Sequence, residues 1–96
     1  MFEVRRTAEF IEWLTALGDV QARARIAKRI DRIAPGNLGD AKPVGDGVSE
    51  LRFTFGPGYR VYFTMWGAVV VILLCGGDKG SQRRDIERTK AMMKEL

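Results

Sequence analysis

Four side chains in the second half of the sequence could together hold a phosphate group. Arg52, Arg60 and Tyr62 occur in two segments that alternate polar and apolar residues, and Lys79 follows an apolar run. If the two segments are paired strands, their polar side chains share one face of a sheet. A guanidinium group matches the oxygens of a phosphate, and a phenol can donate a hydrogen bond or stack on a base. A phosphate-binding sheet face is therefore our first hypothesis.

Such a face suits the cleavage of RNA, which carries its own nucleophile in the 2′-hydroxyl group. If the phosphate is held in line for attack, catalysis depends mainly on positioning and charge stabilisation. We expect Arg52 and Arg60 to neutralise the charge of the transition state, and Lys79 or Tyr62 to assist a proton transfer. The alternative is an ordinary solvated sheet face with scattered cations.

The composition argues against several other kinds of chemistry. The 96 residues include no histidine and a single cysteine, Cys75. Zinc sites, Ser-His-Asp and Cys-His catalysis and an intrachain disulfide are therefore not expected, and we predict a cytoplasmic protein without metal or cofactor. The N-terminus lacks the features of a signal peptide. The uncharged run Val61–Gly77 is better explained by two strands than by a membrane helix.

An excess of basic residues predicts an anionic partner. The sequence has 16 lysines and arginines and 12 acidic residues, which gives a net charge of +4 and a pI near 9.6. Arg25, Arg29 and Arg32 are spaced to form one basic stripe along a predicted helix. We predict that this stripe and Lys42 bind RNA. Contact with an acidic protein segment and simple solvation remain the alternatives for the stripe.

The hydrophobic periodicity predicts one α+β domain over residues 1–96. Its expected order is a strand, two helices, three antiparallel strands and a final helix, with the two N-terminal helices on one face of the sheet. The segment Val69–Cys75 is apolar throughout and is expected to be a central strand, ended by Gly76-Gly77. The other predicted elements are a strand Phe2–Arg5, helices capped by Thr7, Asp19 and Ser81, a loop Asn37–Gly47, and strands Glu50–Phe55 and Tyr59–Trp66.

Three motifs and the N-terminal segment resemble the RelE/ParE superfamily of bacterial toxins, in particular its HigB-like branch of addiction-module killer proteins. The resemblance covers essentially the whole chain. The segments that carry it are VRRTAEFIEWL (Val4–Leu14), GDGVSELR (Gly45–Arg52), GPGYRVYF (Gly56–Phe63) and GGDKGSQRRDI (Gly76–Ile86).

The resemblance implies a small RelE-like fold and the toxin of a type II toxin–antitoxin pair. Such toxins are held inactive by a cognate antitoxin, in this branch usually a helix-turn-helix protein, and the better-known members cleave mRNA in the ribosomal A site. By motif, Arg52, Arg60 and Lys79 correspond to the functional cations of the family. Thr54 stands where RelE itself has a second basic residue, and Asp85-Ile86 occupies the region where several ribonuclease members carry a histidine or tyrosine.

Two other functions fit the same resemblance. A ParE-like toxin would inhibit DNA gyrase without catalysis, although such toxins generally lack the cations on the sheet face. A non-toxic, phage-derived relative would bind RNA only. The cations Arg52, Arg60 and Lys79 favour the endonuclease over the gyrase inhibitor, whereas the missing histidine and tyrosine are the main support for the RNA-binding relative.

Overall fold

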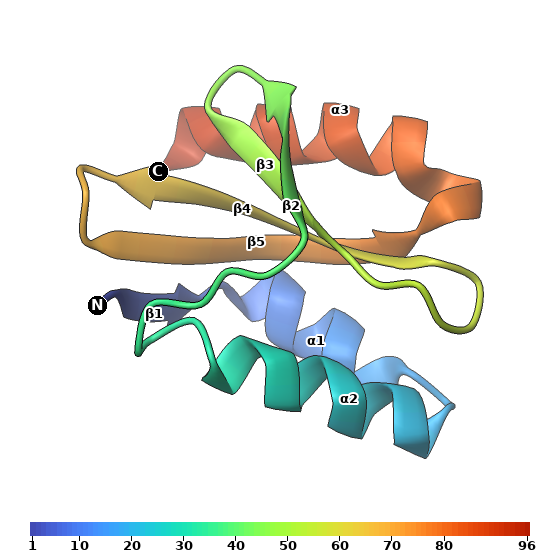
Figure 1. Ribbon diagram of the computed structural model, residues 1–96. Coiled ribbons are helices and arrows are strands. Elements are labelled where there is room, and N and C mark those ends of the chain that lie inside the picture. Colours follow the sequence, from blue (N-terminus) through green and yellow to red (C-terminus); the bar gives the residue numbers. More distant parts are fainter.

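A mixed five-stranded sheet forms the centre of the molecule in a computed structural model that describes residues 1–96 (Figure 1). The strand order is β1-β5-β4-β3-β2, and all neighbours are antiparallel except the parallel pair β1 and β5. The predicted α+β class is thus confirmed. The elements are β1 (Glu3–Arg6), α1 (Ala8–Ala16), α2 (Val20–Asp31), β2 (Ala41–Gly45), β3 (Val48–Arg52), β4 (Tyr59–Trp66), β5 (Val70–Asp78), a 3₁₀ turn η1 (Lys79–Ser81), α3 (Gln82–Met92) and a second 3₁₀ turn η2 (Met93–Glu95).

The helices α1 and α2 cover one face of the sheet, as predicted (Figure 1). Each begins at its predicted cap: the Thr7 hydroxyl accepts the N–H of Phe10, and the Asp19 carboxylate accepts those of the second and third residues after it. Their apolar residues, including Phe10, Ile26 and Ile30, pack on the apolar residues of β3, β4 and β5. This layer is the main core.

The helix α3 lies on the opposite face and closes a second, smaller core (Figure 1). Beneath it, Val48, Tyr62 and Cys75 are buried, and Ile86 and Met93 pack against them. The sheet is therefore covered on both faces over part of its length. None of the helices combines the length and the apolar composition that a membrane span needs.

The strand β2 lies in the segment that we expected to be a loop, so that prediction is wrong for residues 41–45. Asp46 and Gly47, with φ angles of 54° and 79°, form a two-residue turn that folds β2 back onto β3. Positive φ at both positions is the requirement of a type I′ hairpin turn, for which Asp-Gly is a favoured pair. The edge position of β2 tolerates Pro43, which has no N–H to donate.

We expected Gly76 and Gly77 to end the last strand, and this prediction is wrong: both glycines lie within β5. A Cβ atom on Gly76 would lie 2.2 Å from the ring of Trp13, and one on Gly77 would lie 1.8 Å from a carboxylate oxygen of Asp85. The two glycines therefore give room for one side chain from α1 and one from α3. The strand continues to Asp78, and residue 79 begins the turn that leads to α3.

Candidate functional site

The structure brings three of the predicted residues to one hollow at the end of the sheet. Arg52 of β3 pairs directly with Arg60 of β4, and Lys79 follows the end of β5 beside them. The hollow has a volume of about 570 Å³, and its wall also includes Asp40 and the turn Gly56–Gly58. We call it the first hollow.

Arg60 lines the first hollow but is largely enclosed by the protein. Its side chain is 12% exposed, and its Nε lies 3.1 Å from Oε2 of Glu50, which is 3% exposed. Its Nη1 donates to the main-chain carbonyls of Gly58 and Tyr59 at 3.0 Å. The charge of Arg60 is thus partly neutralised by Glu50, but no hydrogen bond within the protein uses Nη2, and the side chain forms part of the wall of the hollow. The expectation that Arg60 binds the transition state therefore stays a prediction.

Arg52 and Lys79 are the accessible cations of the first hollow. The Arg52 side chain is 39% exposed and forms an ion pair with Asp40 at 3.0 Å. The hydrogen bond from Arg52 holds the pKa of the Asp40 carboxyl below its ordinary value, and the same contact raises the pKa of Arg52. Lys79 is exposed and forms no ion pair, and its stem lies against Gly58.

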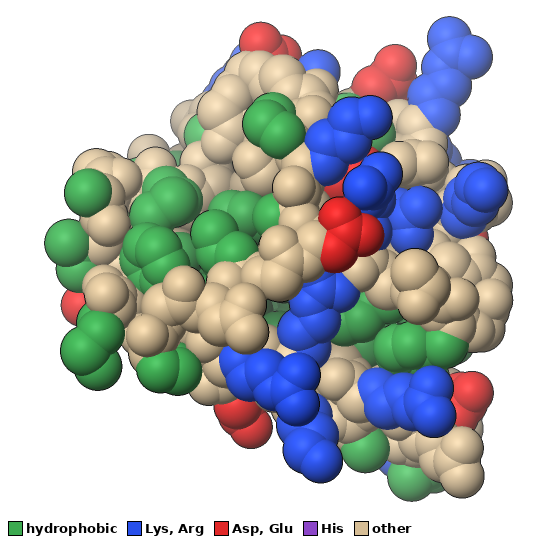
Figure 2. All heavy atoms as spheres, viewed as in Figure 1, with side chains coloured by type: hydrophobic (Ala, Val, Ile, Leu, Met, Phe, Trp, Pro, Cys, Tyr) green, Lys and Arg blue, Asp and Glu red, His purple; other side chains and the backbone are tan.

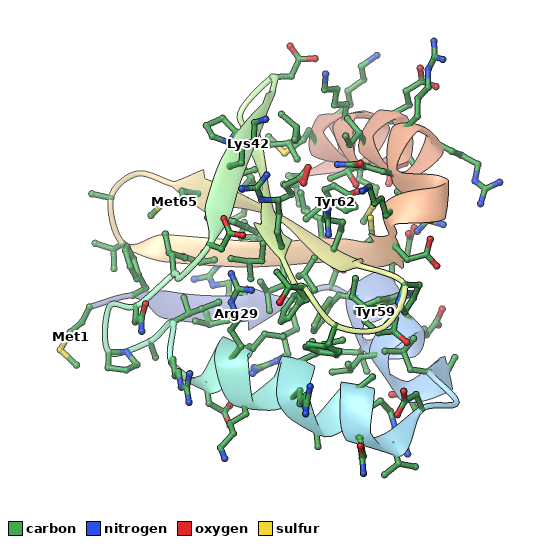
Figure 3. All side chains as sticks on the ribbon, turned by 45° about the vertical axis from the view of Figure 1, so that its right-hand side comes forward. Met1, Arg29, Lys42, Tyr59, Tyr62 and Met65 are labelled. Atoms are coloured by element: carbon green, nitrogen blue, oxygen red, sulfur yellow. The ribbon has the colours of Figure 1, made fainter.

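Tyr62 does not share the open surface with these cations. It is fully buried between the sheet and α3, and its hydroxyl has no hydrogen-bond partner (Figure 3). Burial, reinforced by the carboxylates of Glu50 and Asp85, raises the pKa of its phenol well above the ordinary value near 10. The prediction that Tyr62 transfers a proton is therefore wrong. We had assumed an uncovered sheet face, but α3 covers this part of it.

A second hollow of about 380 Å³ continues from the first onto the surface of α2, and the two share Arg52, Asp40 and Thr54 in their walls. Lys28 and the predicted Arg25 and Arg32 line it. Figure 2 shows lysine and arginine side chains gathering over the middle and right of this face of the molecule. The two hollows together form one continuous surface lined by lysines and arginines, which we call the basic groove.

An aromatic ring also lines the basic groove. Phe55 is half-buried in the second hollow, and the guanidinium carbon of Arg25 lies 5.0 Å from the centre of its ring. Phe55 also packs against the rings of Phe53 and Tyr59. A flat ring among cations offers a surface on which a nucleobase can stack.

Arg29 differs from its neighbours in the predicted stripe because it points from α2 toward the sheet (Figure 3). Its guanidinium group lies 4.5 Å from the ring centre of Phe53 and donates to the main-chain carbonyls of Arg52 and Asp40. Burial lowers its pKa. Because its donors connect α2 to β3 and the preceding loop, Arg29 is not a free RNA-binding group, contrary to our expectation.

Lys42 lies apart from the basic groove. It is exposed on β2, well separated from Arg29 (Figure 3), and lines a different, largely apolar hollow with Pro43, Met65 and Met93. The structure therefore does not bring Lys42 together with the other predicted RNA-binding residues.

Asp40 is the residue of the site that the sequence analysis missed, although a signal for it was present. The Asp46-Gly47 pair predicts a hairpin, and the register of that hairpin, with Ala41 opposite Leu51, sets Asp40 beside Arg52. We interpreted the whole segment as a loop, so the pairing was lost. The contact between Arg60 and Glu50 joins diagonal positions on one face of the neighbouring strands β4 and β3, whereas the hydrogen bonds from Gln82 to Glu50 depend on the position of α3, which the alternation of the strands does not specify.

Comparison with known proteins identifies the family of this chain and a relative of similar length. The family described as "Phage derived protein Gp49-like (DUF891)" matches residues 12–95. An uncharacterized protein of Haemophilus influenzae is 47% identical over 94 residues, which cover 98% of this chain and 95% of the relative.

A solved structure of the E. coli toxin RelE resembles this one over nearly its whole length. That structure is of a mutant with two arginines replaced by alanine, in the free state. The TM-score is 0.72, with 96% of each chain covered and 14% identity. At this identity the match establishes a common fold, and the expected RelE-like architecture is confirmed.

Proposed function

The chain belongs to the family of phage-derived Gp49-like proteins, and on this basis, together with its RelE-type fold, we propose that it is the toxin of a type II toxin–antitoxin module. Within the RelE/ParE superfamily we place it in the HigB-like branch, on the motifs around Arg52, Arg60 and Lys79. Its proposed activity is metal-independent, ribosome-dependent endonucleolytic cleavage of mRNA in the cytoplasm, which arrests translation.

The observation that carries this proposal is the convergence of Arg52 and Lys79 on a solvent-open hollow that continues into the basic groove. A single RNA strand lying in the groove would place backbone phosphates near Arg25 and Arg32 and a base near Phe55. The scissile phosphate would then lie between Arg52 and Lys79. Both side chains end in hydrogen-bond donors with full positive charge, which suits the dianionic transition state of a phosphodiester.

In the proposed reaction the RNA supplies the nucleophile. The 2′-oxygen forms a bond to the adjacent phosphorus as the bond to the 5′-oxygen breaks, which leaves a 2′,3′-cyclic phosphate and a 5′-hydroxyl. The 2′-hydroxyl gives its proton to water, and the leaving oxygen takes one from Lys79 or from water. Arg52 and Lys79 stabilise the charge, and in-line orientation comes from the ribosome. Arg60 holds the turn Gly56–Gly58 that shapes the hollow.

Primer extension on a reporter mRNA in a bacterial translation extract tests the proposal. The wild-type protein is expected to cut inside codons only while the message is translated. Arg52→Ala and Lys79→Ala are each expected to reduce cleavage roughly a hundredfold, the usual effect of losing one transition-state donor. Lys94→Ala, which removes an exposed lysine outside the groove, is the matched control and is expected to cleave like wild type. Intact mRNA in the presence of a growth-arresting wild-type protein would contradict the proposal.

Inhibition of DNA gyrase without catalysis is the second candidate. It is favoured by one observation: of the four predicted catalytic residues, Tyr62 is buried and Arg60 is only 12% exposed, so only Arg52 and Lys79 are readily accessible. A supercoiling assay with purified gyrase separates the candidates. Loss of supercoiling with intact mRNA would support the inhibitor, and RNA binding with neither activity would support a non-toxic RNA-binding relative.

The proposed partner is a cognate helix-turn-helix antitoxin, which would neutralise the toxin. Co-expression of the chain with the product of an adjacent reading frame of this type is expected to restore growth. A copurified complex would identify the antitoxin. Growth arrest that every adjacent reading frame leaves unchanged would contradict this part of the proposal.

A further inference from the structure

Asp40 is the only acidic residue in the wall of the first hollow. One oxygen of its carboxylate, Oδ1, accepts hydrogen bonds from Nη2 and Nε of Arg52 at 3.0 and 3.3 Å. The carboxylate thus uses the donors of Arg52 that a phosphate would need. A negative group of the protein lies where the proposed function requires a negative group of the substrate.

The two arginines that face each other across β3 and β4 differ in how firmly their carboxylates hold them. Arg60 and Glu50 are almost fully buried, and Glu50 also accepts two hydrogen bonds from Gln82 of α3. Arg52 and Asp40 are 39% and 49% exposed. An exposed pair is screened by water and salt and contributes little, so it separates at small cost, whereas a buried pair does not. Arg52 is therefore the arginine that can change partners.

The main chain of Asp40 is fixed independently of its side chain. Its carbonyl accepts the main-chain N–H of Arg52 at 2.9 Å and Nη2 of Arg29 at 2.7 Å. The carboxylate therefore stays beside the hollow after Arg52 has turned away. It is ionised at neutral pH even without Arg52, because the ordinary pKa of an aspartate is about 3.9. A phosphate entering the hollow meets a fixed negative charge.

From these contacts we propose that Asp40 is a positioning residue that sets the oxyanion affinity of the hollow: it holds Arg52 in the free protein and releases it when a phosphate group enters. The inference rests on the proposed role of the first hollow as a phosphate site. A small free anion has only its contacts in the first hollow with which to displace the Asp40 carboxylate from Arg52. An RNA strand that also contacts the cations of α2 has further contacts that offset this competition.

The test uses inorganic phosphate as the probe and the arginine Nε–H signals of the ¹⁵N-labelled protein as the readout. The Arg52 signal is assigned by its disappearance in Arg52→Lys. In wild type, phosphate is expected to shift this signal. Asp40→Asn is expected to move the signal before any phosphate is added and to tighten phosphate binding roughly fivefold, since it removes one charge a few ångströms from the ligand.

Two further variants separate this role from a structural one. Asp40→Glu keeps the charge and is expected to bind phosphate within about twofold of wild type. Asp31→Asn makes the same change of net charge at an exposed position at the end of α2, outside both hollows, and is expected to behave like wild type. Equal phosphate affinity in wild type and Asp40→Asn, an equal gain in Asp31→Asn, or no shift of the Arg52 signal by phosphate would each overturn the inference.

The failure of this inference and the failure of the proposed function give different results. If Asp40→Asn tightens phosphate binding but the translation extract shows no cleavage, the exchange at Arg52 stands and the endonuclease does not. If mRNA is cleaved and Asp40→Asn binds phosphate like wild type, the endonuclease stands and the role of Asp40 does not.

Discussion

At the scale of single residues, the exposed fraction of a charged side chain decides whether it can contact a ligand or only stabilise the fold. Arg52 and Arg60 occupy directly paired positions on neighbouring strands, so their alternation pattern is the same. Both line the hollow, but the Arg60 side chain is 12% exposed and is paired with the buried Glu50, whereas the Arg52 side chain is 39% exposed and is paired with the half-exposed Asp40. A loss of activity on changing Arg60 would therefore reflect folding as well as chemistry.

Arg60→Ala is expected to lower the free energy of unfolding by about 3–5 kcal/mol, because it leaves the buried carboxylate of Glu50 without its partner. Urea denaturation followed by circular dichroism measures this change. Replacing both residues with apolar ones, as in Glu50→Leu with Arg60→Met, is expected to recover part of the loss. A urea midpoint for Arg60→Ala equal to that of wild type would show that the pair is not structural.

Tyr62→Phe is expected to leave mRNA cleavage unchanged and to keep or raise stability by up to about 1 kcal/mol, since the removed hydroxyl is buried without a partner. The raised pKa of Tyr62 adds a pH dependence. The unfolded phenol ionises from about pH 10 while the folded one stays neutral, so stability is retained below pH 10 and lost above it. Urea midpoints of both proteins between pH 8 and about 11 test this: the alkaline loss is expected to be smaller in Tyr62→Phe. Parallel curves, or a loss of cleavage, would contradict it.

At the scale of elements, the sequence was most informative where one residue decides a boundary. Thr7 and Asp19 were predicted caps because their side chains can accept the free N–H groups of a helix start, and both do. The prediction that Gly76 and Gly77 end a strand is wrong, although a glycine pair usually indicates such an end. Glycine is needed at these two positions because the side chains of Trp13 and Asp85 pack against them, and these residues belong to other elements, the helices α1 and α3.

The candidate site was predictable to a similar extent. Alternation in β3 and β4, together with the motifs, placed Arg52, Arg60 and Lys79 near one another. Alternation does not say which part of a sheet face a helix covers, so the burial of Tyr62 under α3 could not be predicted. The inward turn of Arg29 also could not be predicted, because its carbonyl partners come from β3 and from the loop before β2.

Gly76→Ala is expected to destabilise the protein by about 2 kcal/mol or more, because the new methyl group would overlap the ring of Trp13. Thermal unfolding is the measurement, and adding Trp13→Leu is expected to restore part of the loss. Gly18→Ala is the matched control: a Cβ atom there meets nothing within 4 Å, and its φ is not in the left-handed region, so the melting temperature is expected to stay close to that of wild type or to rise slightly. Equal melting temperatures for wild type and Gly76→Ala would contradict the packing described here.

At the scale of the whole molecule, seven of the 16 basic residues line one continuous path, and the others lie outside it. The two hollows connect η1 with α2 across the end of β3, and the apolar residues gather on the other side of the same view (Figure 2). A path of this kind predicts a specific dependence of RNA binding on salt.

Binding of a single-stranded RNA is expected to weaken with salt with a slope of log K against log salt concentration near −3.5. This value corresponds to about five phosphate contacts, one for each of Arg25, Lys28, Arg32, Arg52 and Lys79. Fluorescence anisotropy with a labelled oligonucleotide measures it. Arg25→Gln and Arg32→Gln are each expected to reduce the slope by about 0.7, whereas Lys42→Gln, outside the groove, is not. Equal slopes for all four proteins would contradict the proposed path.

The parallel pairing of β1 with β5 affects when the site assembles during synthesis of the chain. β1 is synthesised long before β5, its neighbour in the sheet, and the Thr7 hydroxyl donates to the carbonyl of Leu74, 67 residues further along the chain. Lys79 leaves the ribosome later still than β5. A nascent chain thus holds Arg52 without Lys79 and β1 without its neighbour, and contacts between such distant segments form late in folding. The site can therefore assemble only after residue 79 has been synthesised, so a shorter nascent chain does not carry it.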